Sequence, residues 1–217
     1  MSAIFPKWTN RLPLVLGVGA ALIGGGVATG VTYYFTQEYA YVGYQPVQPV
    51  PFSHKVHAGE LGLDCRYCHT GVEKSWYANI PAPSLCMNCH GQVLKDDPRL
   101  APIREAIQTG KPVPWVQIHK LPEYVYFNHS VHVNRGIGCV ECHGQVNRMD
   151  EVYEAKSFSM TFCLDCHRDP AAHLRPLDKI TDLDWSAGTS AQQRALGEKL
   201  QHDWNVQSLQ NCSACHR

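Results

Sequence analysis

The sequence predicts a mostly α-helical and irregular chain with low strand content, in which one long apolar helix precedes a domain with little ordinary hydrophobic core. Three observations support this fold class. An uncharged run lies near the N-terminus, a Cys-x-x-Cys-His pattern then occurs five times, and a Phe-x-His-x-x-His pattern occurs twice. The apolar residues of this 217-residue chain are concentrated in the N-terminal run, so few remain to form a core elsewhere.

The run from Leu12 to Thr36 carries no charge and exceeds the roughly 20 residues that cross a bilayer as a helix. Lys7 and Arg11 precede it, and residues 33–35 place aromatic rings near its far end. The positive-inside rule then predicts a single pass through the cytoplasmic (inner) membrane with the N-terminus in the cytoplasm. A cleaved signal peptide is the alternative, but the run is longer than the apolar part of most signal peptides. We therefore expect residues 1–36 to form a retained anchor.

Small residues form a stripe at helical spacing along this run, which predicts close packing against another membrane helix. The stripe consists of Gly17, Ala21, Gly24 and Ala28, with Gly26 and Gly30 as a second small pair. The alternative is that glycine is simply common in membrane helices. Residues 37–51 follow as a proline-rich linker, which we expect to be extended and to connect the membrane to the first motif.

The five Cys-x-x-Cys-His motifs contain every cysteine of the chain and are typical of covalent haem c attachment. Two thiols add across the vinyl groups of the porphyrin, and the adjacent histidine becomes the proximal ligand of the iron. Zinc sites, disulfides and iron–sulfur clusters do not explain a histidine after every second cysteine. The attachment pairs are Cys65 and Cys68, Cys86 and Cys89, Cys139 and Cys142, Cys163 and Cys166, and Cys212 and Cys215. The proximal ligands are His69, His90, His143, His167 and His216.

We expect five covalently bound haem c groups, and the charge and the hydrophobic content of the chain are interpreted with these groups present. The 19 basic and 19 acidic residues balance, and no basic run indicates nucleic-acid binding. Haem faces replace the missing core, with loops and short helices around them. Covalent attachment takes place outside the cytoplasm, so we expect the haem domain on the periplasmic side of the membrane.

The haem region contains an internal repeat. The segment from Phe52 to His57 matches the segment from Phe127 to His132, and each is followed by two haem motifs at similar spacing. We expect a first dihaem module with a haem-free insert at residues 52–126, and a second module with three haems at residues 127–217. The fifth motif lies outside the repeat. Short helices are expected in the haem-free gaps, at residues 98–109 and, capped by Thr189 or Ser190, at residues 190–201.

Each iron has a second axial position, and seven histidines lie outside the motifs. They are His54, His57, His119, His129, His132, His173 and His202. The paired histidines of the repeat are the strongest candidates, because residues at i and i+3 share a helix face. Met160 is a rival ligand for the haem at Cys163, with packing against the porphyrin as the alternative. His173 and His202 have no counterpart in the repeat and are expected at the surface.

The Phe-x-His-x-x-His unit before a haem motif resembles the small multihaem cytochromes of the c7 and c3 type. The whole chain, with its anchor, five motifs and the stretch from Tyr124 to His129, resembles the pentahaem cytochrome c subunit of bacterial alternative complex III. That resemblance implies a distal histidine for each haem. It assigns His54 to the haem at Cys65, His119 to that at Cys86, His129 to that at Cys139, His132 to that at Cys212, and His57 to a haem of the second module.

The same resemblance implies a function without catalysis in this chain. The protein would relay electrons from a quinol-oxidising complex to a cytochrome c or an oxidase. Its partners would be an iron–sulfur subunit, polytopic quinol-binding subunits and a monohaem cytochrome c. One alternative is a quinol dehydrogenase like the tetrahaem anchors of nitrate and nitrite reductases. Another is a multihaem reductase, which needs an open iron position.

Overall fold

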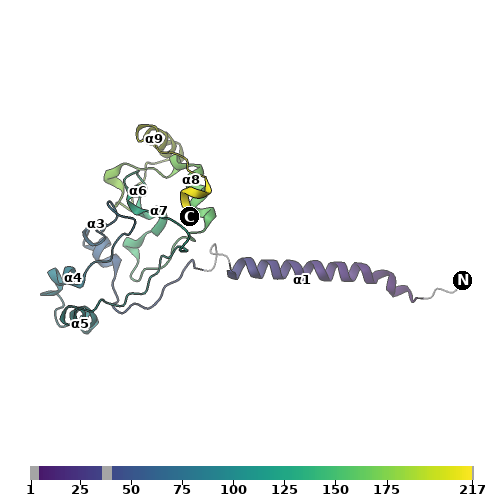
Figure 1. The fold of residues 1–217 in the computed structure, drawn as a ribbon, viewed down its shortest axis with the longest axis horizontal. Coiled ribbons are helices and arrows are strands. Elements are labelled where there is room, and N and C mark those ends of the chain that lie inside the picture. Colours follow the sequence, from purple (N-terminus) through teal and green to yellow (C-terminus); the bar gives the residue numbers. More distant parts are fainter. Residues whose placement is uncertain (1–4, 36–40, 217) are drawn as a thin grey trace.

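The computed structural model describes residues 5–35 and 41–216, which form two parts of very different shape (Figure 1). Helix α1, Leu12–Phe35, extends away from a head in which short helices are joined by long irregular segments. All five haem motifs lie in the head. The predicted anchor reached Thr36, which lies with residues 37–40 of the linker outside the described residues.

The head is built from short helices. Its α-helices are α3 (Cys65–Cys68), α4 (Pro83–His90), α5 (Ala101–Thr109), α6 (His129–Val133), α7 (Cys139–His143), α8 (Met160–Arg168), α9 (Ser190–Asp203) and α10 (Cys212–Cys215). A π-helical turn η2 (Lys55–Glu60) and the 3-10 turns η3 (Pro98–Leu100), η4 (Val146–Arg148), η5 (Pro170–Ala172) and η6 (Leu177–Lys179) complete it. The described residues contain no strand, only two isolated bridges, Val125 with His216 and Ile137 with Leu174. The predicted fold class is confirmed.

Helix α1 is exposed along its whole length. It follows the 3-10 turn η1 (Lys7–Arg11), and none of its residues is buried. A helix this long and this apolar meets the requirements for crossing a bilayer. A Cβ atom built on any of its glycines, such as Gly24, meets no other group within 4 Å. The small-residue stripe therefore faces open space, and the partner helix that it predicts stays a prediction.

The described part of the linker is an extended strap tied to the head. Gly43 donates its N–H to the carbonyl of Glu154 over 2.8 Å, and Glu154 donates to the carbonyl of Tyr44 over 3.0 Å. The Gln48 side chain pairs with the backbone of Val116, donating to its carbonyl over 2.9 Å and accepting from its N–H over 3.0 Å. These bonds satisfy backbone groups that no strand or helix uses.

Both helices predicted for the haem-free segments are present. Turn η3 and helix α5 together span residues 98–109, and Gly110 follows with φ 70°, a left-handed conformation that glycine adopts at little cost. Helix α9 begins at Ser190. Thr189 caps it, because its hydroxyl accepts from the N–H of Gln192 over 3.3 Å while the Gln192 side chain accepts from the N–H of Thr189 over 2.8 Å.

The apolar core is small and divided, as the composition led us to expect. One cluster lies under helix α5 and consists of Val50, Ile103, Ala106 and Val113. Elsewhere the side chain of Leu174 is completely buried. Helix α9 packs on turn η5 so closely that a Cβ atom at Gly197 would collide with the carbonyl of Ala171. This leaves most of the head without an ordinary core, which is consistent with haem groups filling it.

Candidate haem-binding sites

Each of the five motifs lies on a short helix: α3, α4, α7, α8 and α10. One helical turn separates the two cysteines of a motif, so both thiols point to the same side. None of the ten cysteines, all of which lie in the described residues, forms a disulfide, which does not support a disulfide framework. Among residues 5–35 and 41–216, no three histidine, cysteine or acidic side chains gather as a metal-ion site, whereas a zinc ribbon needs four ligands.

Two motif histidines each face a second histidine with nearly parallel rings. The ring centroids of His54 and His69 are 6.4 Å apart with planes at 1°, and those of His129 and His143 are 6.4 Å apart with planes at 6°. Two imidazoles on opposite sides of one iron have centroids about 6 Å apart, because each metal–nitrogen bond is about 2 Å and each nitrogen lies about 1 Å from its ring centre. These residues therefore fit a haem iron. They are the pairs that the resemblance implies.

Two further pairs have the same separation but differ from the implied assignment. The ring centroids of His57 and His90 are 6.1 Å apart at 54°, and those of His132 and His167 are 6.1 Å apart at 74°. His57 therefore lies at the second motif of its own module, not at a haem of the second module. His132 lies at the fourth motif, not at the haem of Cys212. The second histidine of each repeat unit thus faces the histidine of the second motif that follows it along the chain.

Hydrogen bonds to main-chain carbonyls orient most of these rings. The Nδ1 atoms within hydrogen-bonding distance of a carbonyl oxygen are those of His57 with Ser53 (2.8 Å), His69 with Asn79 (2.8 Å), His90 with Val93 (3.0 Å), His129 with Trp76 (2.7 Å) and His132 with Asn128 (2.8 Å). Such a bond holds the proton on Nδ1 and leaves the Nε2 lone pair for a metal. The tautomer thus matches axial ligation.

Burial keeps several of these imidazoles neutral. Loss of solvent lowers the pKa of His54 to about 4 and that of His143 to about 3, and nearby histidines add to the effect. It also lowers the pKa of His129 and His132. Because only neutral imidazole binds a metal ion, these four buried imidazoles are ready for ligation at neutral pH.

The phenylalanine of each repeat unit holds both histidines in place. The Phe52 ring lies edge-on to the first histidine of its unit, with centroids 4.9 Å apart at 86°, and stacks on the second at 4.3 Å and 25°. Phe127 repeats this arrangement at 4.8 Å and 85°, and at 4.6 Å and 28°. The phenylalanine is part of the repeated sequence pattern, but only the structure shows that its ring packs against both histidines of the unit.

His119 lies away from the second motif, where the resemblance had placed it. Its ring meets that of His143 edge-on at 4.4 Å and that of Phe158 at 5.6 Å. Burial lowers its pKa to about 4, and its Nε2 atom is buried without a hydrogen-bond partner in the described part of the chain. The ring that faces His90 is instead that of His57. His119 lies outside the repeated pattern, so nothing in the sequence indicated that its ring would pack against His143.

The fifth motif has a different neighbour. The ring of Tyr124 lies 5.8 Å from that of His216, with planes at 30°. Met160, the rival ligand for the fourth haem, begins helix α8 and is 66 % exposed. The ring opposite His167 is that of His132. The position opposite His167, for which Met160 was a candidate, is therefore taken by the imidazole of His132.

An ion pair between the buried Arg175 and the partly buried Glu141 lies beside the third motif, and the sequence pattern did not predict it. Glu141, inside the motif, accepts from Arg175 over 2.9 Å and lies 3.0 Å from Nδ1 of His173. Arg175 is buried and also donates to the carbonyl of Asp182 over 3.1 Å. His173 is therefore half-buried and partnered, whereas His202 is exposed as expected. Nothing in the repeat pattern signalled this cluster.

The cysteines of neighbouring motifs form a row. The sulfur atoms of Cys65 and Cys139 lie side by side, which places the first motif next to the third. On one side, Cys68 lies close enough to Cys86 for electrostatic interaction, and on the other Cys142 lies close to Cys163. Cys163 in turn lies close to Cys215. The spatial order of the motifs is second, first, third, fourth, fifth.

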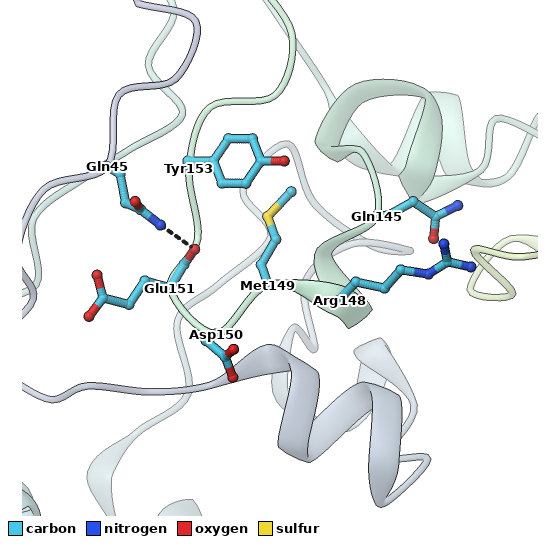
Figure 2. A pocket seen from close by; sticks show the side chains of 7 residues that line it. All are labelled: Gln45, Gln145, Arg148, Met149, Asp150, Glu151 and Tyr153. Carbon is cyan, nitrogen blue, oxygen red and sulfur yellow. Dashed lines mark hydrogen bonds between the residues drawn. The ribbon is translucent and has the colours of Figure 1, made fainter.

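A surface pocket lies outside this row. It is lined by Gln45, Gln145, Arg148, Met149, Asp150, Glu151 and Tyr153 (Figure 2). The Gln45 side chain donates to the carbonyl of Glu151 over 2.7 Å and ties the linker to its rim. The lining contains neither cysteine nor histidine, so this pocket is not a haem-attachment site.

Comparison with known proteins agrees with the geometry. Residues 125–217 match the family of cytochrome c7 and related cytochrome c. Over 205 residues the chain is 34% identical to the multiheme cytochrome c subunit of menaquinone reductase from Nitratidesulfovibrio vulgaris, covering 94% of this chain and 80% of that protein. With its Cys-x-x-Cys-His motifs and facing histidines, the chain belongs to the family of multihaem c-type cytochromes that includes this subunit, and it carries multiple covalent haem c groups.

Proposed function

We propose that this chain is the electron-relay subunit of a membrane-bound, quinone-linked respiratory complex, with five haem c groups. The four facing histidine pairs are the observation that carries this function. When bound, haem c supplies one-electron redox chemistry. Histidines on both sides of a site leave no position there for a substrate. This favours electron transfer in this chain and quinone chemistry in partner subunits.

We assign the ligands from the ring pairs. The proximal ligands are His69, His90, His143, His167 and His216, and the distal ligands of the first four motifs are His54, His57, His129 and His132, in that order. At the fourth motif His132 is preferred to Met160, because its ring stands at the separation expected of a ligand pair. His119 acts as a positioning residue that packs against His143.

The row of cysteines supports relay along the head. A thioether lies on the edge of its porphyrin, so neighbouring cysteines bring porphyrin edges together. The contact of Cys65 with Cys139 places the first and third sites at the centre of the row. The second and fifth sites lie at its ends. Electrons would enter at one end and leave at the other.

The apolar helix supports attachment to a membrane. Because Lys7 and Arg11 precede α1, the positive-inside rule favours a cytoplasmic N-terminus and a periplasmic head. The resemblance to the alternative complex III subunit favours an iron–sulfur subunit, polytopic quinol-binding subunits and a monohaem cytochrome c as partners. The small-residue stripe on α1 would receive one of the polytopic subunits.

The direction of electron flow has two candidates. The resemblance to alternative complex III favours quinol oxidation, with electrons passing through this chain to a cytochrome c or an oxidase. The name of the relative, a menaquinone reductase subunit, favours the reverse, with electrons reaching a menaquinone. Quinol-dependent cytochrome c reduction by the complex purified in mild detergent supports the first. Menaquinone reduction without that activity supports the second.

The ligand assignment is tested on the haem-loaded, full-length chain. We expect five haems per chain, and replacing His54 with alanine converts one of them from low spin to high spin, measured by magnetic circular dichroism. The matched control is His202→Ala, an exposed histidine, which leaves the spectrum unchanged. Retention of every low-spin haem in the His54→Ala protein contradicts the assignment.

A further inference from the structure

The fifth motif differs from the other four in the ring that faces its histidine. Tyr124 stands 5.8 Å from His216, slightly closer than the 6.1–6.4 Å that separates the four histidine pairs. The backbone holds it there. Val125 forms a bridge with His216, and Tyr126 donates its N–H to the carbonyl of Cys215 over 2.7 Å. A phenol ring is thus the neighbour of this motif histidine, whereas the other four have an imidazole as neighbour.

The other histidines of the chain are engaged elsewhere, and all twelve lie in the described residues. Eight form the four pairs. His119 packs edge-on against His143. His173 lies 3.0 Å from Glu141, and the side chain of His202 is 91 % exposed. None of them stands opposite His216.

The separation of the two rings also excludes the phenol oxygen as the ligand in this arrangement. That oxygen lies about 3 Å from the ring centre, and with a metal–oxygen bond of about 2 Å the two ring centres would be about 8 Å apart. At 5.8 Å the centre of the Tyr124 ring would lie about 3 Å from an iron held by His216, which is closer than van der Waals contact, so the ring has to turn aside when a haem is bound. Tyr124 is 63 % exposed, so its side chain can turn outward without opening a packed core.

We propose that the haem attached at Cys212 and Cys215 has His216 as its only ligand from this chain, and that Tyr124 covers a sixth position open to a small neutral ligand such as carbon monoxide. This depends on the proposed function only through the presence of a haem at the fifth motif. Among the five haems, only this one would have an iron with a single histidine ligand. Because the fifth motif lies at an end of the row, the iron at that end would be open to ligands from solution.

The experiment uses the full-length, haem-loaded chain in detergent. Carbon monoxide is added to the dithionite-reduced protein and the Soret band is recorded. We expect a change equal to one haem in five, and a high-spin ferric signal of the same size before reduction. Five low-spin haems per chain with no response to carbon monoxide overturn this inference alone. Fewer than five haems per chain count instead against the proposed function.

A second experiment repeats the carbon monoxide measurement on a variant with histidine at position 124. Tyr124→His places an imidazole where the phenol ring stands, and we expect it to reduce the carbon monoxide response at least about tenfold by closing the iron. The matched control is Tyr41→His, which adds a histidine on the exposed strap and keeps the full response. An unchanged response in Tyr124→His shows that Tyr124 does not cover the sixth position and overturns the proposal.

Discussion

The two repeat units have nearly the same ring geometry but different supports. Distances from each phenylalanine to its two histidines agree within 0.3 Å between the units, and the four histidine pairs repeat the separations of 6.4 and 6.1 Å. In both units the second histidine bonds the carbonyl four residues earlier, at 2.8 Å. The Phe-x-His-x-x-His pattern is therefore a local unit whose shape depends little on its surroundings.

The surroundings differ in how they hold the unit. In the second unit, Nδ1 of His129 bonds the carbonyl of Trp76, which belongs to the first module, whereas Nδ1 of His54 is buried without a partner in the described residues. The second module also has the buried Arg175–Glu141 pair and the close packing of α9 on η5. The first module relies on exposed ion pairs and a small apolar cluster. Nearly the same arrangement of histidine rings thus rests on two different scaffolds.

The largest effect is expected from Arg175→Met. Removing this buried guanidinium leaves Glu141 without its charged partner, and breaking a buried pair in this way costs about 3–5 kcal/mol of unfolding free energy. The matched variant in the first module is Arg66→Met, whose pairs with Asp64 and Glu73 are exposed and worth less than about 1 kcal/mol. Denaturant unfolding of the haem-loaded chain measures both. Equal losses would show that the two scaffolds do not differ.

A smaller effect is expected from a buried carboxyl, and it depends on pH. Burial raises the pKa of Glu154 from 4.5 to about 7, so the folded state holds a proton that the unfolded state has lost. Stability therefore falls as pH rises from about 4.5 to about 7 and then levels off, by about 3 kcal/mol in all.

Glu154→Gln is expected to remove this fall and to be more stable than the unmodified protein at pH 8, as followed by unfolding midpoints between pH 5 and pH 8. Glu73→Gln is the control, because Glu73 is an exposed carboxyl between the two motifs of the first module. A fall of the same size in the Glu154→Gln protein contradicts the assignment to this residue.

The smallest effect is expected from the two phenylalanines, and it tests their equivalence. Phe52→Leu and Phe127→Leu each remove one stacked and one edge-on ring contact, worth about 1 kcal/mol beyond the buried area. The two variants should lose the same stability within about 0.5 kcal/mol. A much larger loss in one of them would mean that its scaffold, rather than the local unit, holds the histidines.

Much of the candidate site was predictable because it is local. Cys-x-x-Cys-His places its ligands within two helical turns, and the i to i+3 spacing of the paired histidines brings them to one face. The same holds for α5, which ends before Gly110, and for α9, which Thr189 caps. The apolar length of α1 likewise depends only on consecutive residues.

The sequence by itself determined where the haem-attachment motifs lie and that the head lacks an ordinary core, because attachment chemistry and composition are properties of neighbouring residues. Only the tertiary structure decided that His57 faces His90, that His132 faces His167, and that Tyr124 faces His216. It also decided that Cys65 meets Cys139. These partners are separated by long irregular segments, whose path depends on packing against the rest of the head and not on the spacing of the motifs.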